Sequence, residues 1–120
     1  MTRPARWRTA GLAIVAAMAA VLPACVSGDL PAAPADDAEL VEGRTVYAAQ
    51  CASCHGADGS GGTGSRLDEG RMAEAYPDPA DQRAVIADGR RAMPAFGNKL
   101  SDAEIDAVVR YTREVLSGGS

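Results

Sequence analysis

Two cysteines and one histidine stand together near the middle of the chain, in the order Cys51-Ala52-Ser53-Cys54-His55. Residues three apart in a helical turn lie on nearly the same side of it, so both thiols can face one edge of a flat macrocycle. The imidazole that follows can then reach a metal at the centre of that ring. A C-x-x-C-H segment therefore predicts covalent attachment of one haem c through Cys51 and Cys54, with His55 as an iron ligand.

Other chemistry for these residues fits the sequence less well. A C-x-x-C pair also occurs as a thioredoxin-like redox site, a structural disulfide or half of a zinc site, and none of these needs a histidine directly after it. A zinc site needs four ligands, and His55 is the only histidine in the chain. A haem-free thiol oxidoreductase using Cys51 and Cys54 remains an alternative, but its C-x-x-C normally follows a strand, and no strand pattern is visible.

The first 24 residues have the pattern of an export signal. Three arginines and no acidic residue precede an apolar run over residues 10–24, which is shorter than the roughly 20 residues of a confident membrane span. The run ends in Leu22-Pro23-Ala24-Cys25, which resembles a bacterial lipobox, so we expect Cys25 to carry lipid. Cleavage after Gly28 and an uncleaved anchor are the alternatives.

Composition limits the partners of the exported chain. The 96 residues from Cys25 onward suffice for one small domain with a limited core, which a covalently held apolar cofactor would complete. The leader holds 3 of the 12 basic residues and none of the 16 acidic ones, so the exported chain has a formal charge of −7. This charge argues against nucleic acid and anionic membrane surfaces as partners, and it favours steering towards a basic patch on a partner.

Local patterns predict an all-α domain. Asp36 is a good N-cap, with Glu39 three residues later, so a first helix is expected to begin near Asp37 and to place Cys51 at helical spacing. The glycine-rich residues 56–64 are expected to form a tight loop against the haem edge. The whole chain is expected to divide into a signal peptide, a loose tether, one folded domain and a frayed tail, over residues 1–24, 25–36, 37–117 and 118–120.

Three further helices are expected downstream. A short one is expected over residues 68–76, and the next has Asp78 as N-cap, Pro79 at its first position and Gly89 at its end. The last helix begins with a capping box, Ser101-Asp102-Ala103-Glu104. Its apolar stripe has helical periodicity and consists of Ile105, Val108, Val109, Thr112 and Leu116.

The iron's second axial ligand must be something other than a histidine of this chain. Beyond the leader, only Met72 and Met93 carry thioethers. Pro94 stiffens the chain beside Met93 and Gly97 permits a turn, and a stiff loop suits a fixed bond. We therefore predict Met93 as the ligand and Met72 as a residue of the core.

The chain resembles the class I c-type cytochromes, the small monohaem electron carriers, over residues 37–116. The resemblance rests on three segments in this order: Gly43-x-x-x-Tyr47-x-x-x-Cys51-x-x-Cys54-His55-Gly56, then Met93-Pro94-Ala95-Phe96, then Leu100-Ser101-Asp102-Ala103-Glu104-Ile105 leading to Tyr111. It implies an all-α cytochrome c fold of three to four helices, in which the first and last cross near Gly43, Tyr47 and Tyr111. It also implies His55 as the proximal ligand and Met93 as the distal one.

One segment departs from the family pattern. Members of the family often carry Gly-Pro-x-Leu after the glycine loop, and the proline carbonyl accepts a hydrogen bond from Nδ1 of the proximal histidine. Here the matching segment is Gly64-Ser65-Arg66-Leu67. The Ser65 carbonyl can still accept that bond, but the loop lacks the stiffness of proline, which bears on the tuning of the haem.

An iron capped by His55 and Met93 has no site for substrate. The expected function is one-electron transfer in an extracytoplasmic respiratory or redox chain, without enzymatic activity. The expected protein is monomeric and is exported to the periplasm or to the extracytoplasmic membrane surface, where lipid on Cys25 anchors it. It is expected to exchange electrons with a membrane dehydrogenase, oxidase or reductase. The alternatives are a haem enzyme or sensor with a labile distal ligand, and an electron-input module of a larger complex.

The surroundings of the haem can also be anticipated. Apolar side chains from several segments are expected to line its pocket, namely Leu67, Ile86, Phe96 and Leu100. Arg90 or Arg91 is expected to meet a haem propionate, with a solvated surface charge as the alternative.

Overall fold

The structure is a computed structural model of the whole chain, and it describes residues 29–118. The residues of the predicted signal peptide and of Cys25 lie outside the described residues. Within residues 29–118 every regular element is helical, and the only β-type pairing is an isolated bridge between Arg90 and Met93. The all-α prediction is confirmed. None of the helices in this part of the chain is long and apolar enough to cross a membrane.

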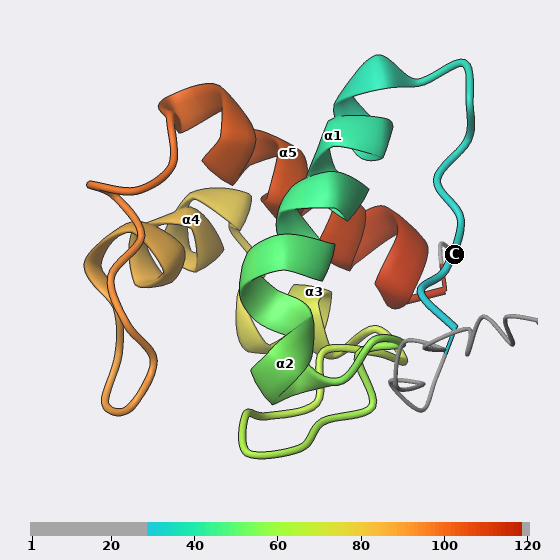
Figure 1. Cartoon of the computed structure of the whole chain (residues 1–120). Coiled ribbons are helices and arrows are strands. Elements are labelled where there is room, and N and C mark those ends of the chain that lie inside the picture. Colours follow the sequence, from blue (N-terminus) through green and yellow to red (C-terminus); the bar gives the residue numbers. More distant parts are fainter. Residues whose placement is uncertain (1–28, 119–120) are drawn as a thin grey trace, which may run out of the picture.

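The first helical run carries the C-x-x-C-H segment on its last turn (Figure 1). It consists of α1 (Ala38–Val46), a π-helical turn (Tyr47–Cys51) and α2 (Ala52–His55). The N-cap is Asp37, whose carboxylate accepts from the amide of Leu40 at 3.0 Å. The sequence predicted Asp36 as the N-cap, which is one residue too early. Asp36 lies in the turn before the helix, whereas Asp37 has the extended backbone that an N-cap requires.

The last helical run crosses α1 at close range. It consists of α5 (Asp102–Tyr111) and a π-helical turn (Thr112–Leu116). A Cβ placed on Gly43 would overlap the carbonyl of Ala107 and lie 2.8 Å from the Cβ of Tyr111, so only glycine allows this approach. Tyr47 and Tyr111 are fully buried beside the crossing, with ring centroids 5.6 Å apart. The predicted crossing is confirmed.

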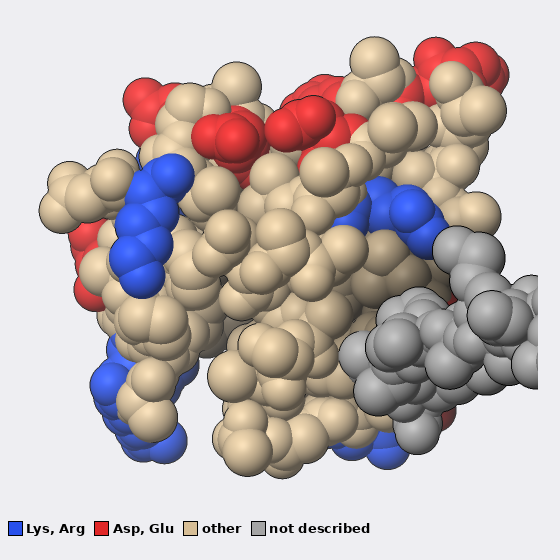
Figure 2. Space-filling model, in the orientation of Figure 1, with Lys and Arg blue, Asp and Glu red and all other residues tan. Residues whose placement is uncertain are grey.

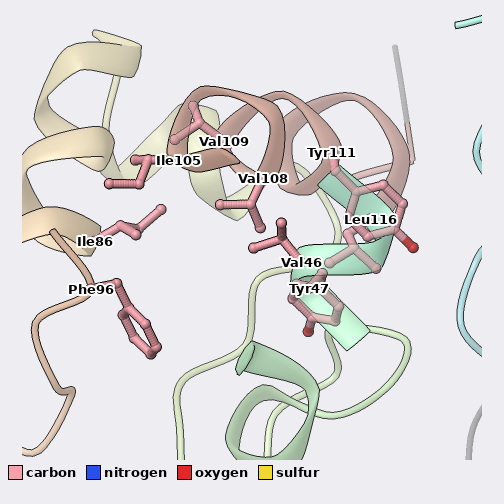
Figure 3. Close-up of a cluster of buried hydrophobic side chains, with 9 residues drawn as sticks. All are labelled: Val46, Tyr47, Ile86, Phe96, Ile105, Val108, Val109, Tyr111 and Leu116. Atoms are coloured by element: carbon pink, nitrogen blue, oxygen red, sulfur yellow. The ribbon is translucent and has the colours of Figure 1, made fainter. Parts of the chain in front are cut away.

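The apolar stripe predicted for the last helix forms the centre of the core. Ile105, Val108, Val109, Thr112 and Leu116 are all buried. Figure 3 shows Ile105 beside Ile86, Val108 and Val109 in the middle of the cluster, and Leu116 at the far side beside Tyr111. The capping box is also present, since Ser101 Oγ accepts from the amide of Glu104 and the Glu104 carboxylate accepts from the amide of Ser101 at 2.7 Å.

Two shorter helices complete the domain. They are α3 (Arg71–Ala75) and α4 (Pro79–Asp88), and both were predicted. The Asp78 carboxylate caps α4 by accepting from the amide of Ala80 at 2.9 Å, and Gly89 ends the helix with a φ of 76°. In Figure 1, α4 lies beside α5 at the left of the molecule.

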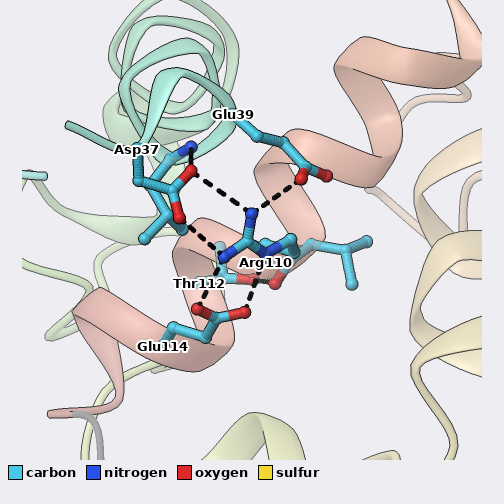
Figure 4. Close-up of polar contacts among 7 residues, drawn as sticks. Asp37, Glu39, Arg110, Thr112 and Glu114 are labelled. Carbon is cyan, nitrogen blue, oxygen red and sulfur yellow. Dashed lines mark hydrogen bonds and ion pairs between the residues drawn. The ribbon is translucent and has the colours of Figure 1, made fainter. Parts of the chain in front are cut away.

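Arg110 links the start of the first helical run to the end of the last helical run. The guanidinium of Arg110 lies between three carboxylates, with Asp37 at 3.0 Å, Glu39 at 2.6 Å and Glu114 at 2.9 Å (Figure 4). Arg110 thereby holds the pKa of the Asp37 carboxyl below its ordinary value. Solvent screens each of these partly exposed pairs, so the network fixes the register of the helices more than it stabilises them.

The described part of the predicted tether lies on the domain. The carbonyl of Pro31 accepts from the hydroxyl of Tyr111 at 2.7 Å and from Nε of Arg44 at 3.1 Å. Leu30 and Ala33 pack against the apolar core. The expectation of a loose segment is therefore corrected for residues 30–33, whose backbone acceptors and apolar side chains have partners on α1 and α5.

Candidate functional site

The two thiols and the imidazole emerge from the end of the first helical run. Cys51 is half-buried, Cys54 is exposed, and both are free thiols. The π-helical turn that ends at Cys51 directly precedes the motif, and such turns recur at functional sites, where they re-aim side chains. Gly56 ends the helix with a φ of 83°, which lets the chain turn away immediately after His55.

The ring of His55 is held by the loop that follows it. Nδ1 lies 2.7 Å from the carbonyl oxygen of Ser65. A carbonyl can only accept, so Nδ1 carries the proton and Nε2 keeps a free lone pair for a metal. The acceptor predicted for the Ser65 position is confirmed. A Cβ on the neighbouring Gly64 would lie 2.9 Å from the imidazole ring, so a glycine at this position leaves the space that the ring occupies.

A cavity of about 1120 Å³ opens beside the motif. Cys51, Cys54, His55 and Met93 all line it. Its apolar wall includes three of the four predicted residues and two further buried side chains, namely Leu67, Ile86, Phe96, Met72 and Val108. Leu100 was the wrong choice for this wall, because it precedes the N-cap of α5 and packs against the apolar core instead.

Met93 lies on a loop whose backbone forms hydrogen bonds within the loop and to α4. The backbones of Arg90 and Met93 exchange two hydrogen bonds, of 3.1 and 3.0 Å. Beyond Met93, the amide of Phe96 donates to the carbonyl of Ile86 at 3.0 Å and that of Gly97 to Ala87 at 2.9 Å. The stiff placement predicted for Met93 is thus present. Met72 lines the same cavity from α3 and is 7% exposed, as expected of a core residue.

The thiols are poorly suited to chemistry as a free redox pair. Burial, together with the neighbouring Cys54, raises the pKa of the Cys51 thiol to about 11. Reactive cysteines of thiol oxidoreductases have lowered pKa values, because the thiolate is the nucleophile. A C-x-x-C pair in which the first thiol stays protonated at neutral pH argues against the haem-free alternative.

Several polar residues at the site were missed by sequence reasoning. Tyr76 lines the cavity, and its hydroxyl accepts from Nη1 of Arg90 at 3.2 Å. Gln82 is buried on α4 and donates to Oγ1 of Thr112 at 2.8 Å. Arg113 ties this pair to the end of α3 by donating to the carbonyl of Tyr76 at 2.8 Å. No sequence pattern marks these contacts, since all of them join residues that are far apart in the chain.

These residues fit haem c. The cavity is large enough for a macrocycle, and both attachment thiols line it. Its walls are mainly apolar side chains, and one imidazole and one thioether line it from separate segments. Polar side chains also line it, among them Arg90 and Tyr76, which are hydrogen-bonded to each other and would suit a carboxylate of such a group.

Comparison with known proteins gives the same result. Residues 38–111 match the family described as Cytochrome C oxidase, cbb3-type, subunit III. Cytochrome c6 of Synechococcus sp. (strain PCC 6312) is 33% identical over 86 residues, which cover 70% of this chain and 77% of that protein. The crystal structure of cytochrome c6C from Synechococcus sp. PCC 7002 superposes with a TM-score of 0.53 at 31% identity, covering 61% of this chain and 92% of that one.

A longer relative contains a domain of the same kind. The Cbb3-type cytochrome c oxidase subunit FixP of Azorhizobium caulinodans is 38% identical over 92 residues, which cover 73% of this chain but 31% of that subunit. The protein is thus a class I c-type cytochrome, with haem c attached through Cys51 and Cys54. It belongs to the family of c-type cytochrome domains that includes subunit III of the cbb3-type oxidases, and its role is that of an electron carrier.

Proposed function

We propose that this protein is a one-electron carrier of an extracytoplasmic redox chain, with His55 and Met93 as the axial ligands of its haem. The observation that carries the proposal is that both side chains line one cavity beside the two attachment thiols. When bound, haem c supplies a one-electron couple between Fe(III) and Fe(II), and thioether ligation raises its potential. With His55 and Met93 both bound to the iron, the protein would have no place for a substrate on the metal.

The chain's own residues would set the conditions for that couple. The Ser65 carbonyl orients the His55 ring through Nδ1 and raises the basicity of the ligand. The hydrogen-bonded loop fixes the backbone of Met93, and Ile86 and Phe96 line the cavity with apolar side chains. Arg90, together with the hydroxyl of Tyr76, is the pair we assign to a haem propionate.

The covalent attachment is tested by denaturation of the haem-loaded protein. We expect the wild type to keep its haem absorbance on the polypeptide in denaturant, because two thioether bonds survive unfolding. A Cys51→Ser/Cys54→Ser variant is expected to release any haem it holds. Ser53→Ala, a change at an exposed position within the motif, serves as the control and should behave as the wild type. Release of haem from the wild type would contradict both the attachment and the carrier function.

We further propose that the protein is exported and anchored by lipid on Cys25, with redox proteins of the membrane as its partners. The support is the arginine-containing leader and the lipobox-like segment that ends at Cys25. Mass spectrometry of the membrane fraction is expected to find an N-terminal Cys25 bearing acyl chains. A peptide that begins after Gly28, recovered from the soluble fraction, would contradict the anchor without affecting the haem site.

A further inference from the structure

Residues 30–33, which we call the strap, contact both of the crossing helices. The guanidinium of Arg44 on α1 donates to two consecutive carbonyls of the strap, that of Leu30 at 3.3 Å and that of Pro31 at 3.1 Å. The hydroxyl of Tyr111 on α5 donates to the same Pro31 carbonyl at 2.7 Å. One short stretch of backbone is therefore bonded to the first and the last helix at the point where they cross.

The two donors on the helices have no other polar partner in the described domain. Within residues 29–118, Arg44 forms no ion pair, and both of its side-chain hydrogen bonds go to the strap. Tyr111 is fully buried, so its hydroxyl needs an acceptor, and the Pro31 carbonyl supplies it. Hydrogen bonds from a charged donor are roughly twice as strong as neutral ones, so Arg44 contributes most to binding of the strap.

Apolar packing and backbone stiffness add to these hydrogen bonds. Leu30 and Ala33 pack against the apolar core. Pro31 and Pro34 restrict the backbone before it binds, which lowers the entropic cost of ordering the segment. The Pro34 carbonyl then accepts from the amide of Asp37, the N-cap of α1, at 3.2 Å. The strap thus runs directly into the first helix and moves with the domain.

The strap and the cofactor cavity lie on different sides of the molecule. None of residues 30–33 lines the cavity. Figure 1 shows the strap along the right edge, whereas α4 and the loop that carries Met93 lie at the left. A surface that faced the strap would therefore leave the side of the Met93 loop open.

The strap shortens the chain that joins the domain to its proposed membrane attachment. Leu30 follows Cys25 by five residues, and Asp37 follows it by twelve. A chain spans at most about 3.5 Å per residue whatever its conformation, so the docked strap keeps Leu30 within about 17 Å of Cys25, whereas a loose tether would allow Asp37 about 40 Å. An uncleaved anchor that ends at residue 24 gives nearly the same limit.

The surface next to the strap is acidic. Figure 2 shows Asp and Glu along the upper edge of the molecule, over the starts of α1 and α5. Asp36, Asp37 and Glu39 lie where the strap leads into α1. These carboxylates repel anionic headgroups, so this surface has no electrostatic attraction of its own for a bacterial membrane. The distance between the domain and the lipid is therefore set by the length of the chain.

We propose that the strap holds the domain close to the membrane, with the crossing of α1 and α5 on the membrane side and the side of the Met93 loop open to a partner. The partner that fits is a redox protein of the same membrane whose electron-exchange site stands about one domain's height above the lipid. The inference rests on the proposed membrane attachment and replaces the expected loose tether by a short-range one. A carrier of this kind serves neighbours in the membrane plane and does not reach partners far from it.

Energy transfer from labelled lipid to the haem measures how close the domain stays. The test uses the full-length haem-loaded protein, purified with its membrane attachment and bound to vesicles of phosphatidylcholine and phosphatidylglycerol that carry a fluorophore on some headgroups. Leu30→Ser/Arg44→Met removes one apolar contact and both arginine hydrogen bonds of the strap. We expect this variant to lose about half of the wild-type transfer or more, because its free chain is longer and the anionic vesicle repels the acidic domain.

Two further variants control this measurement. Val41→Ser/Arg71→Met makes the same two kinds of change at exposed positions outside the strap, and it should keep the wild-type transfer. Six glycine and serine residues inserted between Asp29 and Leu30 lengthen the free chain while the contacts of the strap stay in place, so the transfer should fall. Circular dichroism and haem absorbance are expected to be the same in all variants, which separates release of the strap from loss of the fold.

The outcomes that contradict the proposal differ from those that contradict the attachment. Equal transfer in the wild type and in Leu30→Ser/Arg44→Met, with both bound to the vesicles, would overturn the role of the strap alone. So would an equal loss in the two double variants, or an insertion that leaves the transfer unchanged. A wild-type protein that does not sediment with the vesicles would overturn the membrane attachment and the strap's role together, and the haem site and the carrier function would be unaffected.

Discussion

We expect Met93→Ala to abolish the weak charge-transfer absorption of a thioether–iron bond and to lower the reduction potential by about 0.1 V or more. Thioether sulfur favours the ferrous state, so its loss shifts the couple towards Fe(III). For a one-electron couple, about 59 mV corresponds to a tenfold change in the ratio of the two states. The open iron face of the variant should also bind carbon monoxide, which the reduced wild type should exclude. Absorption spectra of both oxidation states and a redox titration measure these changes.

Met72→Ala is the matched control for Met93→Ala. Both methionines line the same cavity, so the lining alone does not choose between them. We expect Met72→Ala to keep the absorption band and to lose about 2 to 4 kcal/mol of stability, because Met72 is a buried residue of α3. Persistence of the band in Met93→Ala with its loss in Met72→Ala would exchange the roles of the two residues.

The second large effect is expected at the crossing of the first and last helices. Gly43→Ala should lower the free energy of unfolding by about 3 kcal/mol, because the new methyl group would overlap the Ala107 carbonyl and force the helices apart. The gain in helix propensity from glycine to alanine is only about 1 kcal/mol, so it does not offset this overlap. Urea unfolding of the haem-loaded protein measures the difference.

A second glycine provides the comparison for this substitution. A Cβ on Gly70 would meet no atom within 4 Å, although the φ of 76° disfavours a side chain there. Gly70→Ala should therefore cost about 1 kcal/mol of backbone strain and no more. If Gly43→Ala were as stable as the wild type, the close approach of α1 and α5 would not be a requirement of the fold.

Features that depend on neighbouring residues were predictable from the sequence. The capping box at Ser101, the cap at Asp78 and the terminal Gly89 are local hydrogen-bond and backbone requirements, and all three are found in the structure. The C-x-x-C-H segment is equally local, which is why the attachment of haem through Cys51 and Cys54 could be predicted. The Ser65 acceptor was predicted only through the resemblance to the family, because a backbone carbonyl has no signature of its own.

Features that depend on distant partners were not predictable. Asp36 and Asp37 are equivalent as caps in the sequence, and Arg110, which lies 73 residues away from Asp37, pairs with the second of them. Residues 30–33 have the composition of a spacer, but the Pro31 carbonyl accepts hydrogen bonds from Arg44 on α1 and Tyr111 on α5. The buried pair of Gln82 and Thr112 was missed for the same reason, since each residue alone looks like part of a solvated helix face.

The backbone hydrogen bonds around Met93 have a consequence for the speed of electron exchange. With Met93 as a ligand, the loop is held by the paired backbones of Arg90 and Met93 and by the bonds from Phe96 and Gly97 to α4. Such a loop would limit movement of the sulfur between the two oxidation states, so little nuclear rearrangement would accompany the change of charge. The reorganisation energy would then be low, and the rate of exchange would be limited by the encounter and orientation of the two proteins.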